Sequence, residues 1–314
     1  MAEAKRHHYL PVSYLKRFTN DGTDQGILRV YDIQKRECRG QTPLNTAVQR
    51  YYNATRKKDG TRDLRYEKDL SVLEGQLVSI IDNIESGAPL TRFERKKLAF
   101  YVAVQIHRGP DFEEQVRMVV EPMVRRVGKK LFGNHDRAKE ILARRDPETG
   151  EVLEVPPKAL SEMFEKDGYD VEVSRNASLH LMEHQSPQIA DLIMGMEWAF
   201  LHAPDGETFV TSDQPFSFTT FPPQSQTFSP GIVTPGCRKL FPLSARVCLV
   251  IFDRGYGAPH RPASARQVDL INWYIAANAF RYVIGPDART VMRLAETMQT
   301  KFGPKWGGPR YKFG

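Results

Sequence analysis

The most unusual stretch of the chain lies near its start and reads Lys5-Arg6-His7-His8-Tyr9-Leu10-Pro11-Val12-Ser13-Tyr14-Leu15-Lys16-Arg17-Phe18. Chain ends that contact nothing are usually small and polar, because they bury no surface. This segment instead mixes large apolar and aromatic side chains with basic ones. We therefore expect it to be tied onto a core that the rest of the chain is arranged to form.

The composition is that of an ordinary globular protein, since 40% of the 314 residues are hydrophobic and 26% are charged. No stretch approaches the roughly 20 apolar residues that a membrane helix needs, and residues 1–20 lack the apolar core of a secretory signal. Cys38, Cys237 and Cys248 are far apart and lack metal-ligand spacing. We therefore expect free thiols in a reducing cytoplasm, no membrane association and no disulfide-linked partner.

The formal net charge of +7 favours an anionic partner such as nucleic acid. Basic residues cluster at positions 56–58, 92–97, 125–130 and 144–145. Solvated helix faces and loops produce the same clusters, because net charge serves solubility as much as binding. Both interpretations stay open.

Apolar periodicity and turn signals predict a mixed chain. Helices are expected over residues 66–85, 92–108, 111–132, 175–197 (broken at Ser186-Pro187), 264–279 and from 288. Strands are expected over residues 27–33, 197–202, 207–211, 239–243, 246–252 and 281–284, with a hairpin joining 197–202 to 207–211. Residues 146–159 are expected to form a loop or a small hairpin.

These elements predict an α+β fold in which a helical middle region packs against a mainly antiparallel sheet, built from the C-terminal third and the N-terminal strand. One domain is expected over residues 1–300. Residues 301–314 combine glycine and proline with basic and aromatic residues, which predicts a flexible tail. Such a tail can stack on a single nucleic-acid strand or dock an aromatic side chain on its own domain.

The first candidate site is the pair His7 and His8. Imidazoles titrate near neutral pH, so they supply a general acid, a general base or metal ligands. If the segment is a strand, the two rings point to opposite faces, and only one of them easily faces a given pocket. Partial exposure in a basic terminal segment is the alternative.

The second candidate is Thr211-Ser212-Asp213-Gln214-Pro215, which follows an apolar strand, at a position where loops build sites. Asp213 is placed to accept a proton or to hold a divalent cation. Alternatively, Ser212 and Asp213 only cap backbone amides of a turn.

The third candidate is Gln105 with Arg108, which share one face near the end of an otherwise apolar helix. Arg108 can clamp a phosphate or carboxylate through two parallel hydrogen bonds. A buried structural pairing with an acid such as Asp213 is the alternative.

A further motif is rejected. Residues 180–184 match H-x-x-E-H, in which two histidines on one helix face bind zinc. The segment is polar, Pro187 follows closely, and no downstream acid is placed as a third ligand, so the match is weak. Phosphate-loop, dinucleotide-binding and Gly-x-Ser-x-Gly motifs are absent, which disfavours nucleotide-driven motors, Rossmann enzymes and the usual serine hydrolases.

Taken together, these regions resemble a bacterial family known as domain of unknown function 4238. The resemblance spans about residues 5–290 and rests on His7-His8-Tyr9-Leu10-Pro11 with Tyr14-Leu15 and Phe18, Leu98 to Arg108, Trp198 with Phe209 to Pro215, and Pro242-Leu243-Ser244. It implies one composite site that combines the double histidine with the strand end at Asp213. Gln214 stands where an asparagine is common in the family, and Gly109 where a threonine is more usual.

We expect an enzyme, a hydrolase or nuclease-like protein that acts on a phosphate-containing substrate (nucleic acid or nucleotide), in bacterial stress or phage defence. In this hypothesis Asp213 is a base or metal ligand, and Arg108 stabilises developing charge. The other candidates are His7 and His8 as acid, base or metal ligand, His8 with Asp213 as ligands of a divalent metal, and Gln105, Thr211 and Ser212 as substrate-binding residues. The alternative is a non-catalytic module that binds nucleic acid or a protein through its basic clusters and tail.

Overall fold

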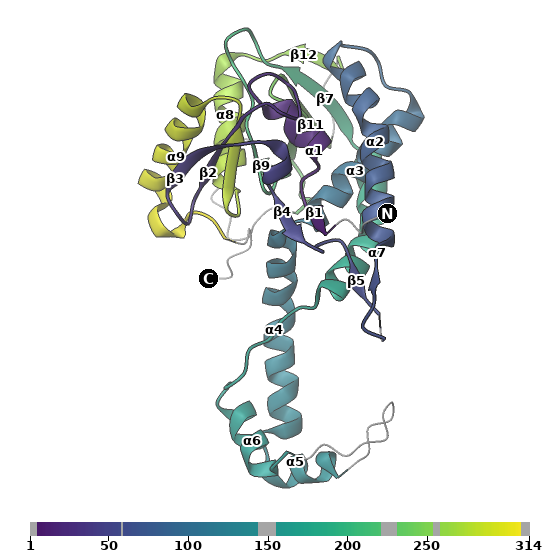
Figure 1. Cartoon of the computed structure of the whole chain (residues 1–314), viewed down its shortest axis with the longest axis vertical. Coiled ribbons are helices and arrows are strands. Elements are labelled where there is room, and N and C mark those ends of the chain that lie inside the picture. Colours follow the sequence, from purple (N-terminus) through teal and green to yellow (C-terminus); the bar gives the residue numbers. More distant parts are fainter. Residues whose placement is uncertain (1–4, 58, 144–154, 221–230, 254–257, 309–314) are drawn as a thin grey trace. The chain divides into compact units, whose positions relative to one another are not determined.

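The computed structural model describes residues 5–57, 59–143, 155–220, 231–253 and 258–308 (Figure 1). Its contacts divide the chain into two compact units, Met1–Phe112 with Arg175–Gly314, and Glu113–Ser174. The single domain expected over residues 1–300 stays a prediction, since compact units of one chain need not fold separately.

The helices and strands follow one another as the sequence pattern predicts in broad outline. The helices are α1 (Val12–Leu15), α2 (Arg65–Glu85), α3 (Arg92–Arg108), α4 (Pro110–Phe132), α5 (His135–Leu142), α6 (Pro157–Glu165), α7 (Arg175–Met194), α8 (Ala265–Ala277) and α9 (Ala288–Phe302). The strands are β1 (Arg6–His8), β2 (Leu28–Asp32), β3 (Glu37–Gln41), β4 (Val48–Arg50), β5 (Thr55–Arg56), β6 (Arg62–Asp63), β7 (Glu197–His202), β8 (Thr211–Ser212), β9 (Ser217–Thr220), β10 (Cys237–Pro242), β11 (Val247–Phe252), β12 (His260–Pro262) and β13 (Tyr282–Gly285).

The fold class is α+β, as expected, but the strands form two main sheets. One has the order β12-β7-β11-β10-β9 and is antiparallel except for the parallel pair β12–β7. The other has the order β3-β2-β13-β8 and is antiparallel throughout. The N-terminal strand β2 therefore joins the C-terminal third through β13, in a sheet separate from β10 and β11.

Strand β11 is buried along its whole length and separates two cores. Val247, Leu249 and Ile251 belong to the core that contains residues of α1, α2 and α3. Cys248 and Val250, which alternate with them, belong to the core beneath α8 and α9. Because side chains alternate across a strand, a wholly apolar strand is what a sheet covered on both faces requires.

Two local predictions are wrong. The expected hairpin does not form, because β7 pairs with β11 and β12 while β8 pairs with β13 of the other sheet. Helix α7 is continuous through Pro187, where a break was expected. Its neighbour Ser186 is buried and its hydroxyl lies 3.1 Å from His107 Nδ1 on α3. Packing of α7 on α3 therefore outweighs the local cost of the proline.

The N-terminal segment is docked as expected, and Tyr14 holds it. The Tyr14 side chain is 1% exposed. Its hydroxyl donates to the Pro242 carbonyl oxygen of β10 at 2.8 Å and lies 2.7 Å from the Thr211 hydroxyl of β8. One phenol therefore joins the opening segment to both sheets.

Residues 301–308 include the end of α9 and a buried aromatic side chain. Lys301 and Phe302 end α9, and Trp306 is buried. The Trp306 indole donates to the Ala276 carbonyl at 2.8 Å and stacks on Tyr31. This agrees with the alternative in which the segment docks an aromatic side chain, and the rest of the expected tail, residues 309–314, lies outside the described residues.

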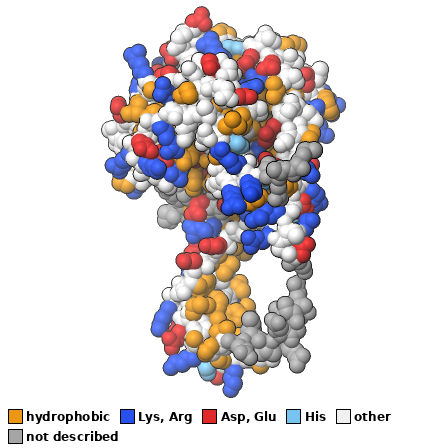
Figure 2. All heavy atoms as spheres, viewed as in Figure 1, with side chains coloured by type: hydrophobic (Ala, Val, Ile, Leu, Met, Phe, Trp, Pro, Cys, Tyr) orange, Lys and Arg blue, Asp and Glu red, His pale blue; other side chains and the backbone are white. Residues whose placement is uncertain are grey.

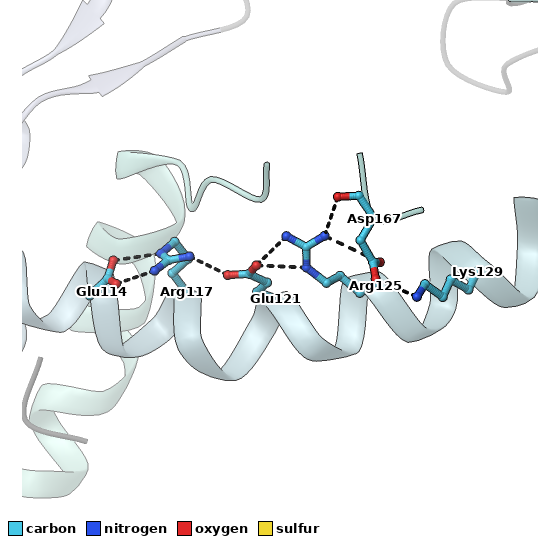
Figure 3. Close-up of polar contacts among 6 residues, drawn as sticks. All are labelled: Glu114, Arg117, Glu121, Arg125, Lys129 and Asp167. Atoms are coloured by element: carbon cyan, nitrogen blue, oxygen red, sulfur yellow. Dashed lines mark hydrogen bonds and ion pairs between the residues drawn. The ribbon is translucent and has the colours of Figure 1, made fainter. Parts of the chain in front are cut away.

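The second unit is built on the part of α4 that follows Phe112. A ladder of charges runs along one side of this helix: Arg117 bonds Glu114 and Glu121 at 2.5 Å, and Arg125 bonds Glu121 at 2.6 Å (Figure 3). The side chain of Asp167 extends the ladder (Figure 3). Exposed apolar side chains, including Val119, Met123, Val124 and Val127, also lie on α4, and Figure 2 shows hydrophobic side chains along this unit.

Within the described ranges no helix is both long and apolar enough to cross a bilayer. Cys38, Cys237 and Cys248 are free thiols.

Replacement of Tyr14 by phenylalanine is expected to lower the free energy of unfolding by about 1–3 kcal/mol, because the buried Pro242 carbonyl and Thr211 hydroxyl lose their partner. Urea denaturation measures the change. The matched control is Tyr66→Phe, whose hydroxyl donates to Glu183 on the surface and whose loss we expect to cost less than about 0.5 kcal/mol. Equal costs for the two variants would contradict the role assigned to Tyr14.

Candidate functional site

The two N-terminal histidines lie in different surroundings, because β1 turns them to opposite faces. His7 is fully buried, and its Nδ1 accepts the Asn53 backbone N–H at 3.0 Å, with Glu67 Oε2 at 3.6 Å. His8 is half-buried, and its Nε2 lies 3.2 Å from the Leu44 carbonyl oxygen. Burial lowers the pKa of His8, so its ring is mostly neutral near pH 7.

Arg108 is committed to structural partners. Its side chain is 2% exposed, and it donates to Glu74 Oε1 at 2.6 Å and to the His8 carbonyl oxygen at 2.5 Å. Burial raises the pKa of Glu74, and Arg108 opposes that shift. The guanidinium therefore ties α3 to α2 and to the strand that carries the histidines. Its acid partner is Glu74, whereas the sequence suggested Asp213.

Gln105 lies one turn before Arg108 and is 4% exposed. Neither atom of its side-chain amide has a hydrogen-bond partner among the described residues. An unpaired buried amide is costly, so this position is a polar defect in an otherwise apolar helix.

Thr211 and Ser212 are buried and bonded within the fold. Thr211 is the partner of Tyr14. The Ser212 hydroxyl donates to the Gln214 carbonyl at 2.7 Å and accepts the Gln214 N–H at 3.2 Å, which closes a tight turn. The neighbouring Gln214 amide bonds Asp111 at the start of α4. This turn fixes the direction in which Asp213 leaves β8.

Asp213 is buried beside β13. One carboxyl oxygen accepts the Phe280 N–H at 3.0 Å and the other accepts the Arg281 N–H at 2.8 Å. Burial raises the pKa of Asp213 to about 7, and the backbone N–H groups only partly oppose that shift. A carboxyl of this pKa is present in both protonation states near neutral pH.

Asp213 lines a polar pocket of about 270 Å³. The other lining residues are Tyr9, Val30, Gln34, Arg39, Gln41, Asn45, Thr46, Ala47, Val48, Gln49, Pro110, Phe280, Arg281 and Tyr282. The pocket is thus enclosed by β2, β3, β4, β13 and the segments that follow β1 and α3.

Two arginines that line this pocket lie near the Tyr282 ring, with their guanidinium carbons 6.0 Å (Arg39) and 5.0 Å (Arg281) from the ring centroid. Arg281 is 33% exposed and is held by the fully buried Asp32, with Nη2 to Oδ2 at 2.9 Å. The Nε of Arg39 is buried and has no hydrogen-bond partner among the described residues. An anion that enters the pocket therefore meets one guanidinium oriented by Asp32 and a second, that of Arg39, whose Nη1 lies 3.4 Å from the exposed Glu37.

The three sequence segments singled out above meet at this pocket, but mostly through neighbours of the residues that we named. Asp213 itself lines it, whereas Tyr9 lines it in place of His8, and Pro110 in place of Arg108. Arg39, Arg281 and Tyr282 were missed, because they lie on or directly beside ordinary strands with no motif. Arg39 lies on β3 and Arg281 directly precedes β13, and these two strands come together only because each of them pairs with β2.

The metal hypotheses require several ligating side chains close together. Across the residues that are described, no group of three or more His, Cys, Asp or Glu side chains is placed to hold a metal ion. His8 and Asp213 have separate partners. In the rejected motif, His180 and Glu183 are exposed and both contact the Tyr66 hydroxyl.

A family model described as protein of unknown function (DUF4238) matches residues 6–289, so the chain belongs to that family. No curated protein matches the chain. No solved structure matches it either.

Replacement of Arg108 by methionine is expected to lower the free energy of unfolding by about 3–5 kcal/mol, because Glu74 is left as a buried unpaired acid. Combining Arg108→Met with Glu74→Leu is expected to recover most of the loss. Thermal and urea unfolding measure both variants. A double variant no more stable than Arg108→Met alone would contradict the pairing.

The raised pKa of Asp213 predicts a pH dependence of stability. A carboxyl whose pKa rises on folding stabilises the fold below its unfolded pKa, and this stabilisation is lost as the pH rises from about 4 to about 7. Over that window the unfolding free energy of the wild type should fall relative to that of Asp213→Asn, by up to about 1.4 kcal/mol per pH unit. Urea denaturation at a series of pH values measures the two slopes, and parallel curves would contradict the shift.

Proposed function

We propose that this DUF4238 protein is a hydrolase that acts on a phosphate-containing substrate, a nucleotide or a nucleic acid, in the Asp213 pocket. One observation carries the proposal: a buried carboxyl with a pKa of about 7 lines the same polar pocket as Arg39 and Arg281. Phosphoryl chemistry needs a proton acceptor that works near neutral pH and cations that stabilise developing negative charge.

The guanidinium groups support phosphate as the recognised group. Arginine matches phosphate oxygens through parallel N–H bonds, and a fixed orientation lowers the entropic cost of binding. Asp32 supplies that orientation for Arg281 through contacts from Oδ1 and Oδ2 to Nε at 3.3 and 3.2 Å. Arg39 pairs only loosely with the exposed Glu37, at 3.4 Å, so it remains able to bind an anion.

The chemistry then follows from Asp213. A water molecule attacks the phosphorus atom and the ionised Asp213 carboxylate accepts its proton. The P–O bond to the leaving group breaks with its electron pair on the leaving oxygen, which takes up a proton from solvent. Arg39 and Arg281 stabilise the charge that develops on the phosphoryl oxygens. In this assignment Arg108 and His7 position the walls of the pocket and touch no substrate.

A pocket that binds without catalysis is the second candidate. The two hydrogen bonds that Asp213 accepts from backbone N–H groups favour it. A carboxylate with the purely structural task of joining β8 to β13 would make the same bonds. In that case the pocket holds a phosphate-containing ligand through its arginines, and Asp213 maintains its wall.

Turnover of p-nitrophenyl phosphate and of bis(p-nitrophenyl) phosphate distinguishes a hydrolase from a pocket that only binds. We expect Asp213→Asn to lower kcat by about 10²–10⁴-fold, and Arg39→Met both to raise KM and to lower kcat, because Arg39 binds the phosphate and stabilises its developing charge. The wild-type kcat/KM should rise with pH through a pKa near 7.

The matched control for charge loss is Arg293→Met, an exposed arginine of α9 that pairs with Asp269 and should leave both constants unchanged. Phosphate-dependent thermal stabilisation without turnover, lost in Arg39→Met and retained in Asp213→Asn, would replace the hydrolase with the binding function. If the wild type shows neither turnover of these substrates nor thermal stabilisation by phosphate, both the hydrolase and the binding function are overturned.

A further inference from the structure

Arginine stands directly opposite arginine in two short strand pairs. In the ladder between β1 and β4, Arg6 is paired with Arg50. In the ladder between β5 and β6, Arg56 is paired with Arg62. All four side chains are exposed, and within the described residues none forms an ion pair with an acid. Like charges placed opposite each other destabilise a sheet, so both pairs oppose folding.

Tyr51 follows β4 and packs against one arginine of each ladder. Its ring lies 3.9 Å from the Arg62 guanidinium carbon and 5.3 Å from that of Arg50. Its φ is 55°, in a region that side chains larger than glycine rarely adopt, and its N–H donates to the Lys5 carbonyl at 2.9 Å. Backbone strain of this kind persists only where surrounding structure enforces it, and it concentrates at functional sites.

The hairpin that carries Arg56 and Arg62 is held against α7. The Asn176 side chain accepts the Arg56 N–H at 2.9 Å and donates to the Arg56 carbonyl at 2.9 Å. The arginines therefore project from a backbone whose position is set, which reduces the entropic cost of binding a partner.

This surface is continuous with the Asp213 pocket. Val48 and Gln49 line the pocket, and Arg50 is the next residue of β4. Arg6 Nη2 donates to the Asn45 side chain at 2.9 Å, and Asn45 also lines the pocket. Figure 2 shows Lys and Arg side chains gathered where Figure 1 draws β1 and β4.

We propose that the arginine surface, formed by Arg6, Arg50, Arg56 and Arg62 around Tyr51, binds a strand of nucleic acid and leads it to the pocket. Phosphates placed between facing arginines convert their repulsion into attraction, and guanidinium planes held on an aromatic ring offer faces on which bases stack. A series of exposed cations along two ladders suits a chain of repeated phosphates better than one small anion. The binding does not depend on Asp213, whereas the choice of nucleic acid as substrate rests on the proposed function.

Fluorescence anisotropy with a labelled single-stranded oligonucleotide tests the proposal. We expect Arg50→Met/Arg62→Met to weaken binding at least tenfold, and the slope of log K against log salt to become shallower by about 1.4, since each lost phosphate contact contributes about 0.7. Arg50→Lys/Arg62→Lys should retain most of the salt slope but bind more weakly, because lysine lacks a planar face.

The matched control is Arg266→Met/Arg293→Met, which removes the same charge from exposed positions of α8 and α9 and should bind as the wild type does. The thermal midpoint of Arg50→Met/Arg62→Met should be no lower than that of the wild type, because repulsion between facing arginines is relieved. This measurement separates lost contact from lost fold.

Three results would overturn the proposal: wild-type affinity in Arg50→Met/Arg62→Met, equal loss in the control pair, or equally tight binding of a poly-glutamate peptide or of phosphatidylserine vesicles. Asp213→Asn should bind the oligonucleotide normally. Oligonucleotide binding without phosphatase or phosphodiesterase turnover would therefore leave the arginine surface standing while the hydrolase fails.

Discussion

The hydroxyl of Tyr14 is the contact on which the rest of the structure depends. It reaches the last residue of β10 in one sheet and the first residue of β8 in the other, and it lies in the segment that continues from the histidines. Burial raises the pKa of this phenol well above its usual value, so the group stays a neutral donor. Because β8 continues directly into Asp213, the bond that docks the N-terminal segment also sets where the pocket carboxyl lies.

A second constraint is which arginine side chains are paired with an acid and which are not. Arg108 and Arg281 are each held by an acid, Glu74 and Asp32, and these pairs fix backbone that borders the pocket. The arginines of β1, β4, β5 and β6 have no such partner among the described residues, and Tyr51 packs against two of them. The fold thus pairs some of its arginines with acids and leaves others exposed beside the pocket.

Much of the fold follows from local pattern. The capping box at Thr91 and Glu94 starts α3, and the stripe from Leu70 to Ile84 forms the buried face of α2. The apolar run Val247–Phe252 becomes the central strand β11. The wrong predictions around Pro187 and Phe209 share one cause: contacts with distant residues decide the structure of these segments, and local sequence signals carry no information about such contacts. Helix α5 was missed, since it is short and mostly polar.

The sequence by itself determined the fold class, most of the helices and strands, and the docking of the N-terminal segment. These depend on periodicity, capping and side-chain size, which act over a few residues. Only the tertiary structure decided which side chains of the candidate segments face the pocket, because a strand turns adjacent residues such as His8 and Tyr9 to different surroundings. It also decided that Arg39 lies near Arg281, since β3, β2 and β13 are far apart in the sequence and become neighbours only through strand pairing.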